Sequence, residues 1–372
     1  MARLNPSRIA LGLAAPALAV LFAGLLTALV LYVSGDPVMS TFKLLVDYGK
    51  QPRSIALTLN QTTTYYLSAL AVAIGFRMNL FNIGVDGQYR LAAFCAAVVG
   101  GAVTLPKPLH ILLIVVVAML VGAMWAGVAA LLKVTRGVSE VISTIMLNAI
   151  ATGLVAFMLR KVRVEVAGSN NIGTKPIPES GAFPGIGLVP GSSLEVVGFI
   201  TVAVLCGIAY TVILNRTRFG FDLRATGRSE SAAVASGVNV KRMVIVSLLL
   251  SGGVAGLVGM PVLLSEAGSR TYSLDFPAGL GFTGIAIALL GRNNAVGMAI
   301  GALLFAFLDV ASVILDINEI SREIVLIMQG TIVLSAVVAY ELVRRYGVVQ
   351  EQRKVSRQLS VDRAEHPEGV PA

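Results

Sequence analysis

Two polar runs interrupt the apolar segments of this sequence, and amides and carboxylates are costly inside a membrane unless something satisfies them. The first run, residues 79–88, reads Asn-Leu-Phe-Asn-Ile-Gly-Val-Asp-Gly-Gln. Its glycines let the chain turn, and Asn82, Asp86 and Gln88 can satisfy backbone groups where a membrane helix is interrupted. The run is either such a break beside a solute pathway or a plain turn between two helices.

The second run, residues 139–148, places polar side chains at helical spacing. Glu140, Thr144 and Asn148 follow one another at i, i+4 and i+8, so they share one face of a helix. That face must meet protein or water, either as hydrogen bonds between helices or as the lining of a pathway. We expect six residues to line a translocation pathway or to support it: Asn82, Asp86, Gln88, Glu140, Thr144 and Asn148.

The sequence lacks the motifs of covalent or metal-assisted catalysis. It contains no GxxxxGK[ST] phosphate loop, no HExxH, no GxSxG and no Cys or His cluster, and its 2 histidines are His110 and His366. Cys95 and Cys206 each lie in an apolar run and are interpreted as small buried hydrophobes. We therefore expect no enzyme activity, no metal and no cofactor bound by this chain.

The elements that must position these residues are membrane helices. The chain is 56% hydrophobic and 13% charged, whereas soluble domains carry about 25% charged residues. This predicts an all-α polytopic membrane protein with about ten spans. The predicted segments are residues 9–33, 54–76, 91–105, 109–132, 141–159, 196–214, 243–265, 279–290, 295–317 and 324–340. Segments 91–105 and 279–290 are too short for a span unless flanking residues extend them or they are broken or re-entrant.

The distribution of basic residues predicts the orientation of the chain. The net charge is +9, and the loops on the side of the termini hold most of the Lys and Arg, which places both termini in the cytoplasm. A transmembrane domain is predicted over residues 1–346, with an outer loop at 160–195 and a cytoplasmic loop at 215–242. Residues 347–372 are charged and polar, and we expect them to form a disordered cytoplasmic tail.

An internal repeat is suggested by two polar, Gly-rich breaks. The first lies at residues 79–88 and the second at 276–294, each beside a short apolar segment and followed by a longer helix rich in Gly and Ala. Paired broken segments in two halves are typical of transporters whose pathway lies at the repeat interface. The glycine pairs Gly252/Gly256 and Gly297/Gly301 are expected to allow close helix packing.

These strings carry a resemblance to a known family. Residues 81–88 resemble the signature of permeases from the ribose, branched-chain amino acid and nucleoside class of ATP-binding cassette (ABC) importers, over about residues 54–340. Residues 139–148, the Lys-Pro-Ile-Pro stretch at 175–178 and the segment 279–286 are similar to nucleoside-type permeases. The resemblance implies an inner-membrane permease that moves nucleosides by alternating access. Phe81, Phe282 and Tyr65 could stack on the base of a nucleoside, and Phe282 is added to the expected pathway residues.

The resemblance also implies partners for this chain. They are a second related permease, an ATPase subunit that binds and hydrolyses ATP, and an extracytoplasmic substrate-binding lipoprotein. Coupling to the ATPase is expected from a short cytoplasmic helix near Arg228 and Glu230, in which Ala232, Ala233 and Gly237 keep the small residues and the glycine of the Glu-Ala-Ala-x-x-x-Gly pattern of ABC importers. Ser231 occupies the acidic position of that pattern, which is a departure from it.

Two alternatives stay open from the sequence. The nearer one is the same machine moving a simple sugar such as ribose. The more distant one is an ion-coupled secondary transporter that works without an ATPase. Uptake assays with labelled nucleosides and sugars separate the first alternative, and uptake by the isolated chain under an ion gradient is the mark of the second.

Overall fold

The computed structural model describes residues 6–165, 172–266 and 268–365, and these fall into two compact units. Unit 1 comprises residues 1–39 and 321–372, and unit 2 comprises residues 40–320. The described residues are predominantly helical, with four two-residue strands in two small antiparallel hairpins. The all-α class predicted from the sequence is confirmed.

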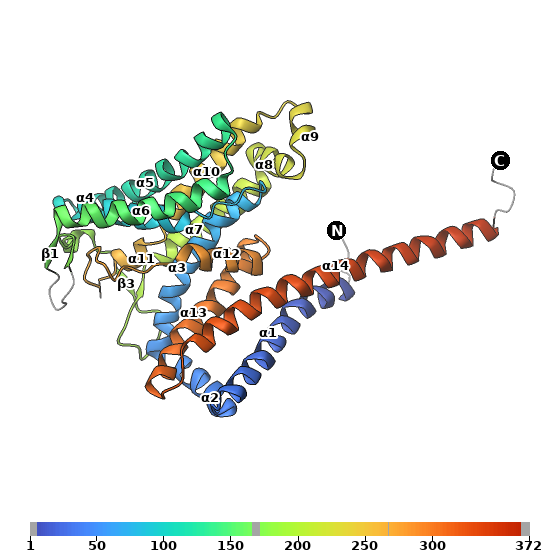
Figure 1. Ribbon diagram of the computed structural model, residues 1–372, viewed down its shortest axis with the longest axis horizontal. Helices are drawn as coiled ribbons and strands as arrows, with labels where there is room; N and C mark the ends of the chain where they lie inside the picture. The colour runs from blue at the N-terminus through green and yellow to red at the C-terminus, as the bar shows by residue number, and fades with distance from the viewer. Residues whose placement is uncertain (1–5, 166–171, 267, 366–372) are drawn as a thin grey trace. The chain divides into compact units, whose positions relative to one another are not determined.

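Unit 1 is a pair of helices from the two ends of the chain. Helix α1 (Pro6–Ser34) packs along α14 (Glu323–Glu365), as the blue and red helices of Figure 1 show. The sequence predicts a disordered tail over residues 347–372, but α14 continues unbroken to Glu365. Residues 347–365 are rich in Gln, Glu, Arg and Lys, which are good helix formers despite their polarity. Residues 366–372 lie outside the described part of the chain.

Unit 2 contains the remaining long helices. They are α2 (Val38–Gly49), α3 (Pro52–Phe76), α4 (Val85–Ala102), α5 (Lys107–Arg136), α6 (Glu140–Val162), α7 (Ile200–Arg216), α10 (Val240–Gly256), α12 (Leu280–Leu290) and α13 (Ala295–Ile317). Polar residues set several of their starts: Asn239 accepts a hydrogen bond from the Arg242 N–H, and Asn294 accepts from the N–H groups of Val296 and Gly297.

Five helices among the described residues are long and apolar enough to cross a membrane: α5, α6, the segment Val240–Leu263, α13 and the first part of α14. Helices α7 and α8 (Arg218–Arg228) together pass as a sixth, bent by 73°. Helix α3 has 25 residues, but the polar stretch 60–64 lowers its hydropathy. The chain is a polytopic membrane protein, as predicted.

Both short segments predicted from the sequence are present as short helices. Helix α4 has 18 residues and begins at Val85, six positions before the predicted Leu91, because the polar run 85–88 forms its first turn. Helix α12 has 11 residues and begins after Gly279, whose φ of +80° suits glycine. At 1.5 Å per residue, α4 spans roughly 27 Å and α12 roughly 17 Å, so α12 is too short to cross alone.

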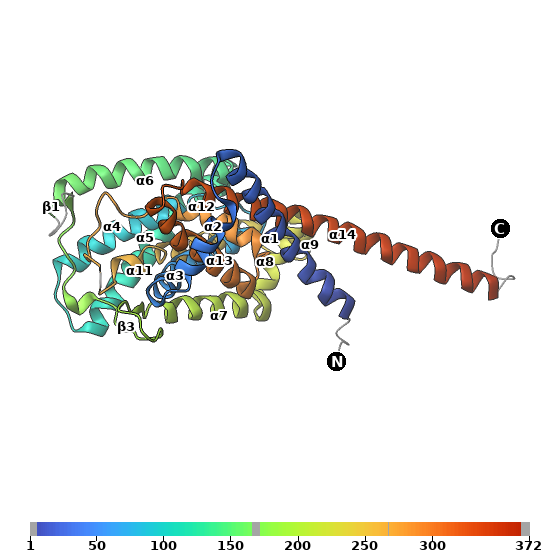
Figure 2. The same ribbon diagram turned by 90° about the horizontal axis from the view of Figure 1, so that it is seen from below.

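Small elements occupy opposite ends of unit 2. At one end lie the hairpins β1 (Val164–Glu165) with β2 (Ile172–Gly173) and β3 (Gly185–Ile186) with β4 (Val196–Val197), the 3-10 turn η1 (Glu179–Gly181) and the short helix α11 (Met260–Leu263). At the other end lie α8 and α9 (Glu230–Ala235), as Figures 1 and 2 show. The two long loops predicted at 160–195 and 215–242 therefore lie at opposite ends, and helix α2 was not predicted.

The closest helix packing in unit 2 joins α5 to α10 through small residues. A Cβ atom built on Gly256 would lie 2.1 Å from the carbonyl oxygen of Ala118, and one on Gly252 would lie 2.4 Å from that of Gly122. The backbones of the two helices are thus in contact, which only residues with little or no side chain permit. The close packing expected of the Gly252/Gly256 pair is confirmed.

Substituting Gly256→Val is expected to destabilise the protein strongly, because the new side chain would have to displace the backbone of α5. Overpacking a tight interface costs about 1–3 kcal/mol, and backbone cannot rearrange as a side chain can. The control is Gly253→Ala on the same helix, where an added Cβ comes no closer than 3.8 Å to α5. Thermal unfolding of the purified protein in detergent should show a lower midpoint for Gly256→Val alone; equal midpoints would contradict the packing.

Candidate functional site

The chain enters the interior of unit 2 between α3 and α4. After α3 ends, Asn79 adopts a left-handed conformation with φ of +58°, and the Leu80 N–H donates to the Gly75 carbonyl at 3.0 Å. A Cβ on Gly75 would lie 2.8 Å from the Leu80 carbonyl oxygen, so the close approach of Leu80 to the end of α3 requires glycine at position 75. The linker 77–84 thereby folds back against the end of α3.

Asn82 is the centre of a closed hydrogen-bond network. Its Nδ2 donates to Gln88 Oε1 at 2.9 Å and to Ser251 Oγ at 2.8 Å, while its Oδ1 accepts from the Gly84 N–H at 3.1 Å and from Gln88 Nε2 at 2.9 Å. Ser251 of α10 in turn donates to the Ala71 carbonyl of α3 at 2.6 Å. Asn82 and Gln88 are fully buried and use their hydrogen bonds to hold the break together.

Asp86 joins the first turns of the two short helices. Its Oδ1 accepts from the backbone N–H of Gly279, just before α12, at 2.8 Å. The Tyr89 hydroxyl lies 3.1 Å from the same Oδ1 and 2.7 Å from the Pro277 carbonyl oxygen. A Cβ on Gly281 would come within 2.7 Å of the Asp86 nitrogen, so α4 and α12 begin in direct contact. The two predicted breaks therefore meet at one carboxylate, beside two positive helix ends.

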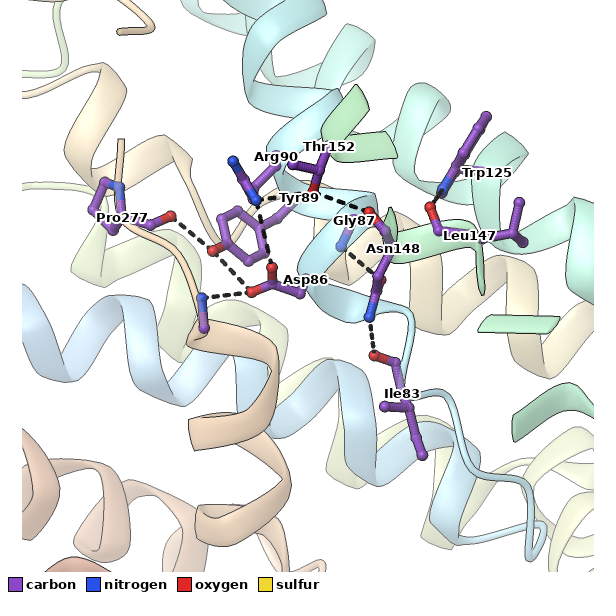
Figure 3. Close-up of polar contacts among 11 residues, drawn as sticks. Ile83, Asp86, Gly87, Tyr89, Arg90, Trp125, Leu147, Asn148, Thr152 and Pro277 are labelled. Atoms are coloured by element: carbon purple, nitrogen blue, oxygen red, sulfur yellow. Dashed lines mark hydrogen bonds and ion pairs between the residues drawn. The ribbon is translucent and has the colours of Figure 1, made fainter. Parts of the chain in front are cut away.

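The polar face of α6 packs against this junction. Asn148 Oδ1 accepts from the Gly87 N–H at 2.8 Å, and its Nδ2 donates to the Ile83 carbonyl at 2.9 Å, as Figure 3 shows. Asn148 lies well inside α6, so α4 begins part-way along that helix. An amide in this position satisfies one donor and one acceptor that the interrupted helix leaves open.

Glu140 and Thr144 contact the linker from the first turns of α6. Glu140 Oε1 lies 3.4 Å from the Phe81 N–H and its Oε2 pairs with Lys133 at 2.6 Å. Thr144 donates to the carbonyls of Glu140 and Val141 in its own helix. A Cβ atom built on Gly84 of the linker would lie only 3.0 Å from the Cβ of Thr144. Both side chains are buried, so in this conformation they brace the linker.

Arg90 belongs to the same cluster, although its sequence position places it in a loop. It lies in the second turn of α4, where its Nη1 donates to Thr152 Oγ1 of α6 at 3.1 Å and lies 4.0 Å from Asp86 Oδ2 (Figure 3). The signal that could have found it is the i,i+4 spacing from Asp86, which pairs opposite charges on one helix face. The late start predicted for the segment hid that spacing.

The aromatic residues near the junction differ in exposure. Phe282, in the first turn of α12, is 57% exposed and follows Gly281, which contacts Asp86. Phe81 is 44% exposed and meets Phe76 edge-on with ring centroids 5.1 Å apart. Tyr65 is buried and donates to Asp309 at 3.1 Å. Phe282 is thus the exposed aromatic side chain beside the Asp86 junction.

The residues expected to couple to an ATPase lie at the far end of unit 2. Ser229 caps α9 by accepting from the Ala232 N–H, and Gly237 ends it with φ of +81°. Ala233 is buried, whereas Glu230, Ala232 and Arg228 are exposed. Val234, which the sequence reasoning did not single out, is 61% exposed. Helix α9 therefore presents a small, partly apolar outer face.

Comparison with known proteins assigns the family. Residues 54–337 match the model of the branched-chain amino acid transport system / permease component family. The chain belongs to this family. It is 33% identical to the guanosine ABC transporter permease protein NupP of Bacillus subtilis, over 88% of this chain and 93% of that protein. No solved structure matches the chain.

Two further relatives extend the permease assignment. The permease is 31% identical to the glucose ABC transporter permease protein TsgB13 of Haloferax volcanii, over 84% of this chain and 83% of that protein. It is 30% identical to the nucleoside ABC transporter permease protein NupB of Lactococcus lactis, over 87% of this chain and 90% of that protein. The chain is therefore a membrane-spanning transport subunit of an ABC importer, as the resemblance in its sequence implies.

In this permease, Asn148→Leu is expected to destabilise the junction. The Gly87 N–H and the Ile83 carbonyl would both lose their partner, and each buried unsatisfied group costs about 1–3 kcal/mol. The matched control is Ser143→Ala on the same helix, whose hydroxyl donates to the carbonyl oxygen of Ser139, the residue that precedes α6, at 2.9 Å. Thermal unfolding should separate the two variants by several degrees, and a Ser143→Ala loss as large as that of Asn148→Leu would contradict the assignment.

Proposed function

We propose that this permease translocates nucleosides across the bacterial inner membrane by alternating access. The observation that carries the proposal is its similarity, at 33% and 30% identity over most of both chains, to permeases named for guanosine and for nucleosides. The short helices α4 and α12, whose first turns meet at Asp86, supply the break at which a pathway opens to one side or the other.

The proposed assembly contains three further kinds of subunit. They are a second related permease, an ATPase that hydrolyses ATP, and an extracytoplasmic lipoprotein that delivers the solute. Both termini and α9 face the cytoplasm, which follows from the excess of Lys and Arg in the loops on that side. The coupling residues are those of the α9 segment: Arg228, Glu230, Ala232, Ala233 and Gly237.

The geometry supports a defined role for each group of site residues. Asn82, Gln88, Glu140, Thr144 and Asn148 brace the break, since their hydrogen bonds are made within the protein. Asp86 joins α4 to α12, and exposed Phe282 lies beside that junction. When α9 moves with the ATPase, rigid-body motion of the helices changes the contact between α4 and α12 and so the access to the pathway.

A second candidate substrate is a simple sugar, and the 31% identity to a permease named for glucose favours it. The test is uptake by the complete transporter in proteoliposomes, with labelled guanosine, glucose and ribose supplied separately at saturating binding protein. We expect ATP-dependent accumulation of guanosine at least tenfold above that of either sugar. Accumulation of a sugar without a nucleoside would replace the proposed substrate and leave the transporter class unchanged.

A further inference from the structure

Asp86 and Arg90 face each other with hydrogen-bonding capacity that the protein does not use. Asp86 Oδ1 is occupied by the Gly279 N–H and lies near the Tyr89 hydroxyl, but Oδ2 has only Arg90 Nη1, at 4.0 Å, among the described residues. That separation is too long for a hydrogen bond. The side chains of Asp86 and Arg90 are 12% and 20% exposed, so part of each side chain is accessible.

Arg90 is also incompletely paired. Its Nη1 donates to Thr152 Oγ1 at 3.1 Å, and the guanidinium also hydrogen-bonds the side chain of Tyr272. Its Nε is buried without a hydrogen-bond partner in the described part of the chain. Thr152 itself is saturated on its donor side, because its hydroxyl donates to the Asn148 carbonyl at 3.0 Å. A guanidinium held only to build the fold would usually have its donors satisfied.

The chemistry of the pair suits a group that both donates and accepts hydrogen bonds. A carboxylate accepts hydrogen bonds and a guanidinium donates them, whereas a hydroxyl does both at a single oxygen. A hydroxyl that approaches Asp86 Oδ2 and Arg90 from the side can donate to the first and accept from the second, and a neighbouring hydroxyl can use the remaining sites. A solute with a single charge would be repelled by Asp86 or by Arg90, so the pair favours a solute without net charge that carries donors and acceptors side by side, as neighbouring hydroxyl groups do.

The location of the pair fits a solute site. It lies where α4 and α12 begin, part-way along α6, and not at either end of unit 2. The three relatives compared above are named for guanosine, glucose and nucleosides. A sugar with neighbouring hydroxyl groups is common to guanosine, glucose and the ribonucleosides, while the base is not.

We propose that Asp86 and Arg90 form a recognition site for two neighbouring hydroxyl groups of the transported solute. The inference rests on the proposed function, in which this junction borders the pathway. It makes the ribose, and not the base, the part of a nucleoside that the permease itself recognises.

The test compares two solutes in each variant of the complete transporter. Proteoliposomes are supplied with guanosine or 2′,3′-dideoxyguanosine, each preloaded on the binding protein, and initial uptake is normalised to the amount of assembled complex. Arg90→Gln is expected to lower guanosine uptake at least tenfold and dideoxyguanosine uptake less than twofold. The control Arg136→Gln, at the exposed end of α5, is expected to leave the ratio between the two solutes unchanged.

Equal fractional losses of the two solutes in Arg90→Gln would overturn the site, since a purely structural arginine cannot distinguish them. Arg90→Lys provides a second test if Arg90→Gln fails to assemble, because it keeps the charge but not the planar set of donors. It should lower the ratio of guanosine uptake to dideoxyguanosine uptake, by a smaller factor than Arg90→Gln. If the wild-type complex imports glucose and no nucleoside, the proposed substrate fails. The same ratio measured with glucose and its monodeoxy derivatives then decides the site independently.

Discussion

The substitution Asp86→Ala is expected to abolish solute uptake by the assembled transporter. It removes the acceptor of the Gly279 N–H, the link between the first turns of α4 and α12, and leaves Arg90 without its acidic neighbour. Removing one partner of a buried ion pair costs about 3–5 kcal/mol, and the partial exposure of this pair places the effect at the lower end. Initial uptake rates at matched membrane abundance measure the loss, which we expect to exceed a hundredfold.

The matched variant Asp86→Asn separates the hydrogen bond from the charge. An Asn side chain keeps an oxygen for the Gly279 N–H and loses the negative charge. We expect it to assemble normally and to transport at roughly a tenth of the wild-type rate, because the hydrogen bond from Gly279 loses its charge assistance, and hydrogen bonds to charged groups are worth about 1.5–3 kcal/mol against about 0.5–1.5 kcal/mol for neutral ones. Uptake by Asp86→Ala within twofold of wild type would show that the junction has no part in transport.

The substitution Val234→Asp is expected to uncouple the permease from its ATPase while the membrane helices stay folded. Val234 is 61% exposed on α9, at the end of unit 2 opposite the hairpins, and makes the outer face of that helix apolar. A carboxylate there has to be desolvated when the helix enters a groove of a partner. Co-purification of the ATPase and ATP-driven uptake should both fall at least tenfold.

The control for this prediction is Leu188→Asp. Leu188 is a similarly exposed apolar side chain, 52% exposed, in the loop between β3 and β4 at the other end of unit 2. It should leave co-purification of the ATPase unchanged. If both variants retain the ATPase and transport normally, α9 does not couple the subunits, and another element at its end of unit 2 must do so.

Much of the architecture follows from the sequence because membrane helices must satisfy their own backbone groups. The amides of Asn82, Gln88 and Asn148 are expensive in lipid, so their presence predicts hydrogen-bond partners inside the protein or in water, and in the structure all three have partners inside the protein. The small residues Gly252 and Gly256 likewise predict a close helix crossing, which α5 and α10 form. These inferences succeed because each depends on the chemistry of single residue types: an amide needs a hydrogen-bond partner in a membrane, and a glycine leaves room for a second helix.

Other features depend on contacts between distant parts of the chain. That Asp86 receives the Gly279 N–H could not be predicted, because 193 positions separate them and no local spacing relates the two breaks. The role of Arg90 was hidden for a related reason: the polar first turn of α4 looks like a loop until Asn148 supplies its missing hydrogen bonds. Helix α2 was missed because its apolar residues line one face and not its whole circumference.

The measurement that tests the account most directly is energised uptake by purified components in liposomes. With the second permease, the ATPase and the solute-loaded binding protein present, we predict that this permease supports guanosine accumulation with ATP and none with a non-hydrolysable analogue. Accumulation by the isolated chain under an ion gradient, without ATP or partners, would contradict the account and identify a secondary transporter.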